Sequence, residues 1–321
     1  MRTAFLLLAA AAASAAAAAP RYAVLPPGRD SDVRVFEPDG RVLDGAAALA
    51  AMSRGTGLSL WLAGNQFFAM KDVVAGFRRA DPKAGSVAVM TLPPGLLLQA
   101  ILKGGWNCAG KDYALKPDVY STVDLAHLRA LKARGLAKRY FVYTRNELAL
   151  MVAAGNPKRV KGIADLARPD LRVYLPNPRN EGIMSVYGRK VLERHGLYRS
   201  LTGGKECAGC RATPRVYLTA VHHRETPAAI AAGRADVGLV WRTENENARR
   251  AGLPVQGVSL PPRDSERGEA GYEICALTGA AHPAAARAYL SFLKSAAGQR
   301  AYAAFGFIPA ARADLRARAI R

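Results

Sequence analysis

Short apolar runs and stretches of helical periodicity alternate along most of the chain. Three of the runs have the length of buried strands: LSLWLAG, SVAVM and DVYST. Between them, apolar residues recur every three to four positions, and Phe67, Met70, Val74 and Phe77 form one such helical face. Strands that alternate with helices form a mostly parallel sheet covered by helices. The pattern therefore predicts an α/β fold from about Leu58 onwards.

The same alternation resumes after a longer apolar run, ELALMVAAGNP, which we interpret as a strand that passes into a second unit. Further along, GYEICAL is typical of a strand that returns to the first unit, and a helix begins at Pro283. The sequence therefore predicts two lobes joined by two crossing segments, with hinges near 143–147 and 260–271. The predicted division is 58–143 for the first part of lobe 1, 144–260 for lobe 2, and 261–321 for the remainder of lobe 1.

Two further segments precede this pattern. Residues 1–19 contain Arg2, an apolar stretch from Ala4 to Ala13, and small residues before position 20, as in a secretory signal peptide. The apolar stretch is shorter than the ~20 residues that cross a bilayer, so we expect cleavage and a periplasmic protein. Residues 20–57 form an N-terminal extension, in which DVRVFEPDGRVLDG predicts a hairpin.

The composition is strongly basic. The chain has 321 residues, with 46 Lys and Arg against 25 Asp and Glu, and a net charge of +21. A charge of this size suits a nucleic acid, an anionic membrane or an acidic ligand. The basic residues are scattered in twos and threes, and no nucleic-acid-binding motif accompanies them. We therefore interpret the charge as a solvated basic surface and expect no nucleic-acid partner.

Nothing in the sequence is typical of catalysis. It has no Ser-His-Asp order, no Gly-rich phosphate loop and no paired acid–base carboxylate signature. We therefore expect a binding protein without a cofactor rather than an enzyme.

Six segments follow one another in a recognisable order: LWLAGNQFFAMKDVVAGFRRADP, TLPPGLLLQAILKGG, DVYSTVDLAHLRAL, RNELALMVAAGNPKRVKGIADLARPDLRVYLPNP, ETPAAIAAGRADVGLVW and AAARAYLSFLKSAAGQRAYAAFGFIPA. From about Leu58 to Pro309 the chain resembles the periplasmic solute-binding proteins of ABC importers, and most of all the molybdate-binding type. The resemblance implies a two-lobed type-II periplasmic binding protein fold with the ligand cleft between the lobes. It also implies a monomer that closes on its ligand and delivers it to an ABC permease in the inner membrane. A sensor or scavenger with the same fold is the alternative.

The resemblance also directs attention to the ends of the predicted strands, because ligands of this family lie where helix N-termini of both lobes converge. The expected ligand-binding residues are Asn65, Gln66, Thr91, Gly95, Glu181, Ser185, His222, His223, Thr226 and Trp241. Thr226 is also expected to cap the helix that follows, with Pro227 in its first turn. For Trp241, packing in the core is the simpler interpretation.

Two ligand classes remain open at these strand ends. Pro93 and Pro94 remove N–H donors where an oxyanion would need them, and nearby carboxylates such as Glu181 repel an anion. A metal ion or a metal complex would instead find imidazole and carboxylate ligands there. The candidate metal ligands are His222, His223 and Glu225. We favour an oxyanion similar to molybdate or tungstate, because the family and the basic charge support it.

Cys207 and Cys210 precede the two histidines at a spacing that also occurs in zinc sites. Exported proteins oxidise their thiols, so we favour a disulfide between these cysteines over a periplasmic metallochaperone or redox site. Cys108 and Cys275 both fall in the predicted lobe 1, where a second bridge is feasible. Two further acidic residues are interpreted as surface or helix-capping residues: Glu244 and Glu273.

Overall fold

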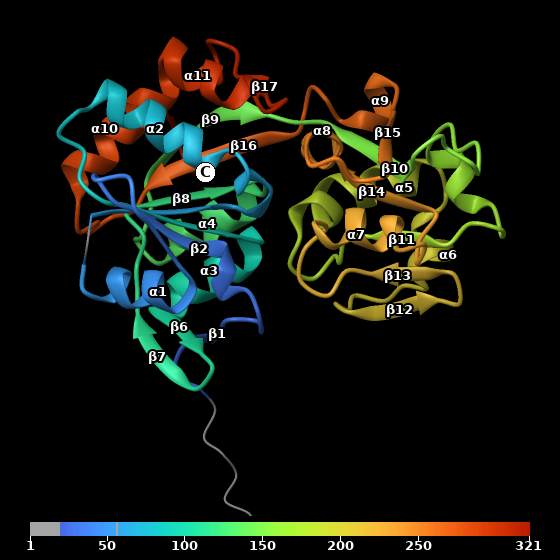
Figure 1. Cartoon of the computed structure of the whole chain (residues 1–321), viewed down its shortest axis with the longest axis horizontal. Coiled ribbons are helices and arrows are strands. Elements are labelled where there is room, and N and C mark those ends of the chain that lie inside the picture. The colour runs from blue at the N-terminus through green and yellow to red at the C-terminus, as the bar shows by residue number, and fades with distance from the viewer. Residues whose placement is uncertain (1–19, 56) are drawn as a thin grey trace, which may run out of the picture.

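The computed structural model describes residues 20–55 and 57–321 as two lobes, which lie side by side in Figure 1. Both lobes are α/β units, as the alternation of strands and helices predicts. The signal peptide predicted for residues 1–19 lies outside the described residues. Within the described part of the chain, no helix is long and apolar enough to cross a membrane.

Lobe 1 is built on one sheet, whose strands are β2 (Val33–Phe36), β3 (Val42–Asp44), β4 (Leu58–Ala63), β5 (Val87–Leu92), β8 (Val119–Thr122), β9 (Arg139–Arg145), β16 (Gly271–Ala276), β17 (Ile308–Pro309) and β18 (Arg318–Ala319). Their order is β17-β9-β16-β8-β4-β5-β2-β3, and β18 pairs with β9. β4 is parallel to β5 and β8, whereas β16 is antiparallel to β8 and β9. A separate small sheet contains β1 (Ala23–Val24), β6 (Gly105–Cys108) and β7 (Lys111–Ala114).

Helices cover both faces of the lobe 1 sheet. One face carries α2 (Met70–Ala80), α10 (Pro283–Lys294) and α11 (Ala296–Ala303), and the other carries α1 (Gly45–Ser53), α3 (Pro94–Lys103) and α4 (Leu125–Ala133). Successive side chains of β4 point to opposite faces, so Leu60 and Leu62 pack in the first core and Trp61 packs in the second. Burial on both faces explains why this strand is an unbroken apolar run. Short 3-10 turns also occur, η1 (Asp30–Asp32) before β2 and η2 (Gly64–Gln66) after β4.

Residues 20–55, from the segment 20–57 predicted as an extension, are built into lobe 1. β2 pairs antiparallel with β5, so that Val35 lies opposite Ala88. β3 completes the predicted hairpin with β2. Leu49 of α1 is fully buried in the same core as Trp61. The segment therefore supplies an edge hairpin and a covering helix to the main sheet.

Lobe 2 has a six-stranded sheet of β10 (Leu148–Ala153), β11 (Val173–Leu175), β12 (Cys210–Thr213), β13 (Val216–Leu218), β14 (Val237–Trp241) and β15 (Val255–Ser259). The order is β12-β13-β11-β14-β10-β15. β11 is parallel to β13 and β14, and β10 is antiparallel to β14 and β15. This repeats the β5-β4-β8-β16-β9 order of lobe 1, so each lobe presents the carboxyl ends of three parallel strands at one edge.

The helices of lobe 2 are η3 (Ile163–Ala167), η4 (Ile183–Gly188), α5 (Arg189–Arg194), α6 (Tyr198–Thr202), α7 (Glu225–Ala231) and α8 (Arg242–Arg250). Residues 183–194 form one continuous helical segment. It begins as the π-helix η4 and continues as α5. Shortly after the end of α5, Gly196 has a φ of 68°. π-helical turns often occur at functional sites, and η4 begins two residues after Glu181.

Two segments connect the lobes. β9 ends at Arg145 and β10 begins at Leu148, whereas the return runs from β15 through α9 (Pro262–Ser265) to β16. β9 and β16 pair with each other and extend from lobe 1 towards lobe 2 in Figure 1. Both crossings fall within the ranges predicted for the hinges.

Replacing Leu49 by alanine tests whether residues 20–57 are part of lobe 1. Because Leu49 is fully buried, Leu49→Ala should lower the free energy of unfolding by about 2–5 kcal/mol. Leu102→Ala is the matched control, at a helix position that is 36% exposed, and it should cost much less. Urea denaturation measures both effects. Equal effects of the two substitutions would contradict a core role for α1.

Candidate functional site

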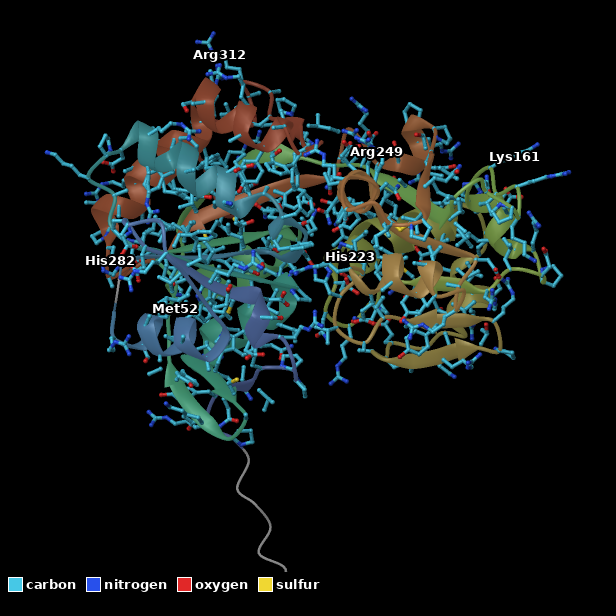
Figure 2. All side chains as sticks on the ribbon, in the orientation of Figure 1. Met52, Lys161, His223, Arg249, His282 and Arg312 are labelled. Atoms are coloured by element: carbon cyan, nitrogen blue, oxygen red, sulfur yellow. A yellow bond between two sulfur atoms is a disulfide. The ribbon has the colours of Figure 1, made fainter. Side chains whose placement is uncertain are left out.

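Each lobe has three parallel strands, and the carboxyl ends of the two sets meet where the lobes touch. β4, β5 and β8 of lobe 1 end opposite β11, β13 and β14 of lobe 2. Residues at these ends enclose a hollow of about 20 Å³, with room for about one water molecule. Its lining comprises Ala63, Gly64, Asn65, Pro93, Pro94 and Val123 from lobe 1, and Glu181, Gly182, Ile183, His222, His223 and Trp241 from lobe 2. Figure 2 shows His223 at the edge of lobe 2 that faces lobe 1.

Glycines allow the lobes to approach each other this closely. A Cβ atom on Gly64 would lie 2.2 Å from Nε2 of His222, and a Cβ atom on Gly182 would lie 2.6 Å from Cγ2 of Val123. A side chain at either position would hold the lobes apart. The structure is therefore that of a closed form.

Larger hollows lie elsewhere on the surface. One of about 590 Å³ lies at the amino ends of β11 and β13, and its lining includes Arg172, Tyr174, Arg215 and Tyr217. Open α/β sheets, however, bind ligands at the carboxyl ends of their strands. The smaller hollow, which six such ends surround, is therefore the candidate site.

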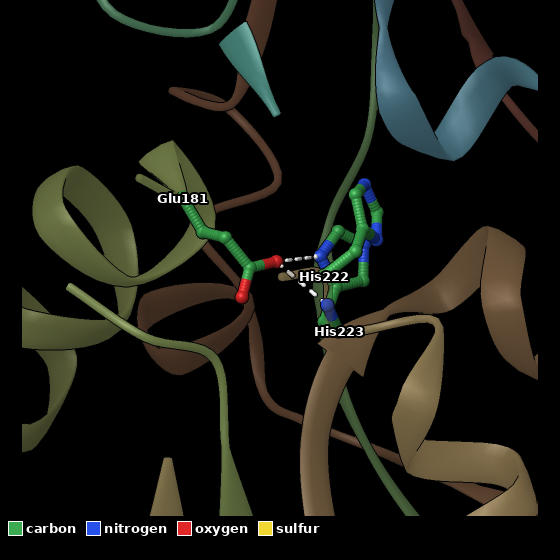
Figure 3. Close-up of side chains that lie close together, drawn as sticks. All are labelled: Glu181, His222 and His223. Carbon is green, nitrogen blue, oxygen red and sulfur yellow. Dashed lines mark hydrogen bonds and ion pairs between the residues drawn. The ribbon is translucent and has the colours of Figure 1, made fainter. Parts of the chain in front are cut away.

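His223 is buried between two carboxylates. Its Nδ1 lies 2.6 Å from Oε2 of Glu181 and its Nε2 lies 3.1 Å from Oε1 of Glu244; Figure 3 shows the contacts with Glu181. A carboxylate only accepts hydrogen bonds, so both ring nitrogens donate and the ring is an imidazolium. Burial by itself lowers the pKa of His223, but the charge of Glu244 and the hydrogen bonds to both carboxylates outweigh burial and raise the pKa to about 9.

The two carboxylates differ in how they are satisfied. Oε1 of Glu181 accepts from the backbone N–H of Asn177 at 3.0 Å and from the hydroxyl of Thr219. Glu244 lies in the first turn of α8, where the helix dipole favours a negative charge, and its Oε2 has no hydrogen-bond partner among the described residues.

Glu244 and Glu273 are buried, so the interpretation of both as surface or capping residues is wrong. Burial raises the pKa of Glu273 to about 8.

His222 presents a hydrogen-bond donor to lobe 1. Its Nδ1 accepts the backbone N–H of Arg224 at 3.1 Å, so the neutral ring carries its proton on Nε2. That nitrogen is directed towards Gly64, and the ring lies against His223 with the centroids 4.0 Å apart. Burial above all, followed by the charges of His223, Arg224 and Arg29, lowers the pKa of His222 well below its usual value.

Two other expected site residues line the hollow, Asn65 and Trp241. Nδ2 of Asn65 donates to the hydroxyl of Tyr272 at 2.6 Å and lies 3.4 Å from Oγ1 of Thr243, which belongs to lobe 2. Trp241 packs against Tyr272 with the ring centroids 6.1 Å apart. Gln66 is directed into lobe 1 instead, where its Oε1 accepts from two tyrosine hydroxyls.

The remaining expected residues lie outside the lining. The side chain of Thr91 is 3.4 Å from the carbonyl oxygen of Asp32, and a Cβ atom on Gly95 would lie 3.2 Å from the carbonyl oxygen of Asn180. Ser185 is exposed on η4. Gly95 is therefore an interlobe contact, whereas Ser185 is directed to solvent.

Helix α7 starts two residues earlier than predicted, at Glu225 instead of Pro227. Glu225 is its first residue, and the Glu225 carboxylate accepts the backbone N–H groups of Ala220, Val221 and His222. Those bonds fold the loop onto the helix start, and Thr226 is fully buried with its hydroxyl unpartnered in the described structure. The prediction that Thr226 caps this helix is therefore wrong. The carboxylate of Glu225 is likewise committed to the loop rather than directed into the hollow.

The cysteines behave as two different pairs. Cys207 and Cys210 form the disulfide predicted from the sequence. Their thiols are therefore not available to a metal. Cys108 and Cys275 are free, so the second bridge considered from the sequence is absent from the described residues. Cys275 is buried in β16 of the main sheet, whereas Cys108 lies in the small sheet.

Comparison with known proteins assigns this arrangement to a family. The profile of the family described as bacterial extracellular solute-binding protein matches residues 58–308. This chain belongs to that family. The molybdate-binding protein ModA of Mycobacterium tuberculosis is 25% identical over 191 residues, which is 59% of this chain. The solute-binding protein spans 65%, just under two thirds, of the length of that curated relative.

Solved structures show the same two-lobed fold. The periplasmic molybdate-binding protein of Azotobacter vinelandii matches with a TM-score of 0.60 at 20% identity, over 79% of this solute-binding protein and 100% of that chain. The sulfate-binding protein SubI of Mycobacterium tuberculosis matches with a TM-score of 0.60 at 19% identity, over 81% and 88% of the two chains. The predicted fold is confirmed.

His223 makes the stability of the solute-binding protein depend on pH. Its pKa of about 9 in the folded state exceeds the ordinary value of 6.5, so the folded protein holds a proton that the unfolded chain releases between these values. The stabilisation is complete below about pH 6.5, declines as the pH rises, and is lost above about pH 9. It amounts to at most about 3 kcal/mol.

Urea denaturation across this pH range measures the effect in the wild type and in His223→Gln. The slope of stability against pH should be steeper in the wild type than in the variant, which keeps the contribution of Glu273, whose pKa is raised to about 8. A slope of the same size in both proteins would assign the titration to other groups.

Proposed function

We propose that this solute-binding protein captures a small inorganic oxyanion, similar to molybdate or tungstate, outside the cytoplasm and delivers it to an ABC permease. The observation that carries the proposal is the Nε2–H group of His222, a fixed donor beside the strand ends of both lobes. A fully ionised oxyanion accepts hydrogen bonds and donates none, so a donor at this position suits it. The names of the relatives, which bind molybdate or sulfate, support the same class.

Backbone N–H groups add to this donor. The first N–H groups of a helix have no partner within the helix, and Gly64 and Gly182 lie at the starts of η2 and η4. At α3, prolines occupy the first position and the one before it, so Gly95 provides the first N–H group. Both lobes therefore offer hydrogen-bond donors at the hollow, and an oxyanion there does not need an arginine side chain. Arg179, which is close in sequence to Glu181, is exposed to solvent.

The size of the hollow limits the ligand. Sites for organic molecules typically enclose about 300–1,000 Å³, whereas the closed lobes leave about 20 Å³ here. A small ion requires a slight separation of the lobes, but an amino acid or a sugar requires a much larger one. An inorganic ion therefore fits this closed form better than an organic solute.

A metal ion or metal complex is the second candidate, because ligand atoms of Glu181, His222 and His223 lie within 4.8 Å of one another. A metal binds a ring nitrogen that carries no proton. Both nitrogens of His223 donate to carboxylates, and Nδ1 of His222 already accepts a backbone N–H group. A metal would have to displace protons and rearrange both rings, so we place the oxyanion first.

Calorimetric titration distinguishes the two candidates. The purified protein is titrated with molybdate, tungstate and sulfate, and separately with Zn²⁺ and Cu²⁺, in two buffers of different ionisation enthalpy. We expect an oxyanion to bind, and His222→Ala to weaken that binding about tenfold or more, because a lost hydrogen bond to a charged group is worth about 1.5–3 kcal/mol. His195→Ala is the matched control, since His195 is exposed and bonds Asp264.

Two results would overturn the oxyanion proposal. One is metal binding with release of protons and no binding of any oxyanion. The other is oxyanion binding that His222→Ala leaves unchanged, because the donor assigned to the site would then play no part in it.

Delivery to a permease is tested in cells that produce the protein. Deleting its gene should lower the uptake of labelled molybdate from a dilute medium, because the permease then receives no loaded binding protein. Unchanged uptake, with molybdate binding retained by the purified protein, would favour a sensor or scavenger.

A further inference from the structure

Arg224 reaches from lobe 2 across to lobe 1, beside the candidate site. Its Nη1 lies 2.8 Å from Oδ1 of Asp32, and its Nη2 donates to the carbonyl oxygen of Thr91. The guanidinium group lies over the ring of Phe67, 4.1 Å from the centroid. All three partners belong to lobe 1. One side chain of lobe 2 therefore makes an ion pair, a hydrogen bond and a cation–π contact across the interface.

The ion pair is almost enclosed by protein. The exposed fraction of the side chain is 11% for Arg224 and 10% for Asp32. When the lobes separate, water reaches both groups. Removing one partner of an enclosed pair leaves the other charge buried without compensation, which is strongly destabilising. The closed form therefore depends on both groups, whereas the open form does not.

The segment before β4 holds Asp32 in place. Asp32 ends η1 and directly precedes β2, in which Val33 lies opposite Met90 of β5. Nη1 of Arg29 lies 3.5 Å from the other carboxylate oxygen of Asp32. The family match covers residues 58–308, so the carboxylate of this contact comes from a segment that precedes the matched region.

Arg224 is also linked to the donor of the candidate site. Its backbone N–H bonds Nδ1 of His222, and its Nη2 would lie 3.1 Å from a Cβ atom on Gly64, which lines the hollow. Arg224 itself does not line the hollow. It is therefore a positioning residue, which acts on the ligand through the loop and through closure.

We infer that the Asp32–Arg224 ion pair is a closure clamp, which keeps the ligand-free protein largely closed and thereby raises its affinity for the ligand without touching it. Residues 20–57 are then part of the binding machinery, because they supply Asp32. The inference rests on one part of the proposed function, namely that the lobes open and close around a ligand. It holds for an oxyanion and for a metal ion alike.

Solution scattering of the ligand-free protein tests the clamp. The wild type should have the radius of gyration calculated for the closed structure, and Asp32→Asn should have a larger one, because closure would bury Arg224 unpaired. The matched control is Asp39→Asn, since Asp39 lies in the same segment, is exposed, and pairs with Arg41 on the hairpin turn. Circular dichroism and thermal melting establish that each variant is folded.

A double variant separates the ion pair from general damage. Asp32→Asn combined with Arg224→Met removes the attraction across the interface without leaving a charge buried, so its radius should stay larger than that of the wild type but below that of Asp32→Asn. A double variant as compact as the wild type would show that closure does not need the ion pair, and would contradict the clamp. An extended wild type, or an Asp32→Asn variant with the wild-type radius, would overturn the clamp.

Calorimetric titration with molybdate gives a second readout. Asp32→Asn should weaken molybdate binding about tenfold or more, because the apparent affinity falls with the fraction of closed protein, and Asp39→Asn should not. Equal affinities of wild type and Asp32→Asn would count against the clamp. If molybdate does not bind the wild type, the oxyanion proposal fails and the scattering results still decide on the clamp.

Discussion

The protonated imidazole of His223 is the interaction on which the candidate site depends. It joins Glu181, which follows β11, to Glu244, which lies in the first turn of α8, so that three segments of lobe 2 meet at one positive charge. Without that charge, two buried carboxylates would lie on either side of a neutral ring, which is unfavourable in a medium of low dielectric constant. Both ring nitrogens of His223 are hydrogen-bonded within lobe 2, so His222 is the histidine that offers a ring nitrogen to lobe 1. The backbone N–H of Arg224 donates to Nδ1 of His222, which places the His222 proton on Nε2.

Three consecutive residues thus have three different tasks. His223 anchors the loop in lobe 2, His222 offers a donor at the hollow, and Arg224 contacts lobe 1 through Asp32 and Thr91. Neighbours in the chain move together, so any shift of the loop changes all three contacts. Under the proposed function, recognition of the ligand by His222 and closure of the lobes by Arg224 are therefore coupled through one short segment.

The sequence predicts the two-lobed fold well, because burial on both faces of parallel strands leaves apolar runs that are easy to recognise, as in β4 and β14. It also places His222 and His223 at a strand end, where the structure has them lining the hollow. The sequence does not reveal that Glu244 is buried, because the polar residues of α8 are typical of a solvent-exposed helix. Only the folded structure brings His223 into contact with Glu244. Nor does the sequence reveal Asp32, because its partner is 192 positions away in the chain and no local pattern encodes such a distance.

Nitrogen NMR of the protein with isotope-labelled histidines tests the central claim most directly, because the two ring nitrogens report which of them carries a proton. His222→Ala and His223→Gln assign the signals. At neutral pH the account predicts protons on both nitrogens of His223 and on Nε2 alone of His222. A neutral His223, with a nitrogen free to bind a metal, would contradict it.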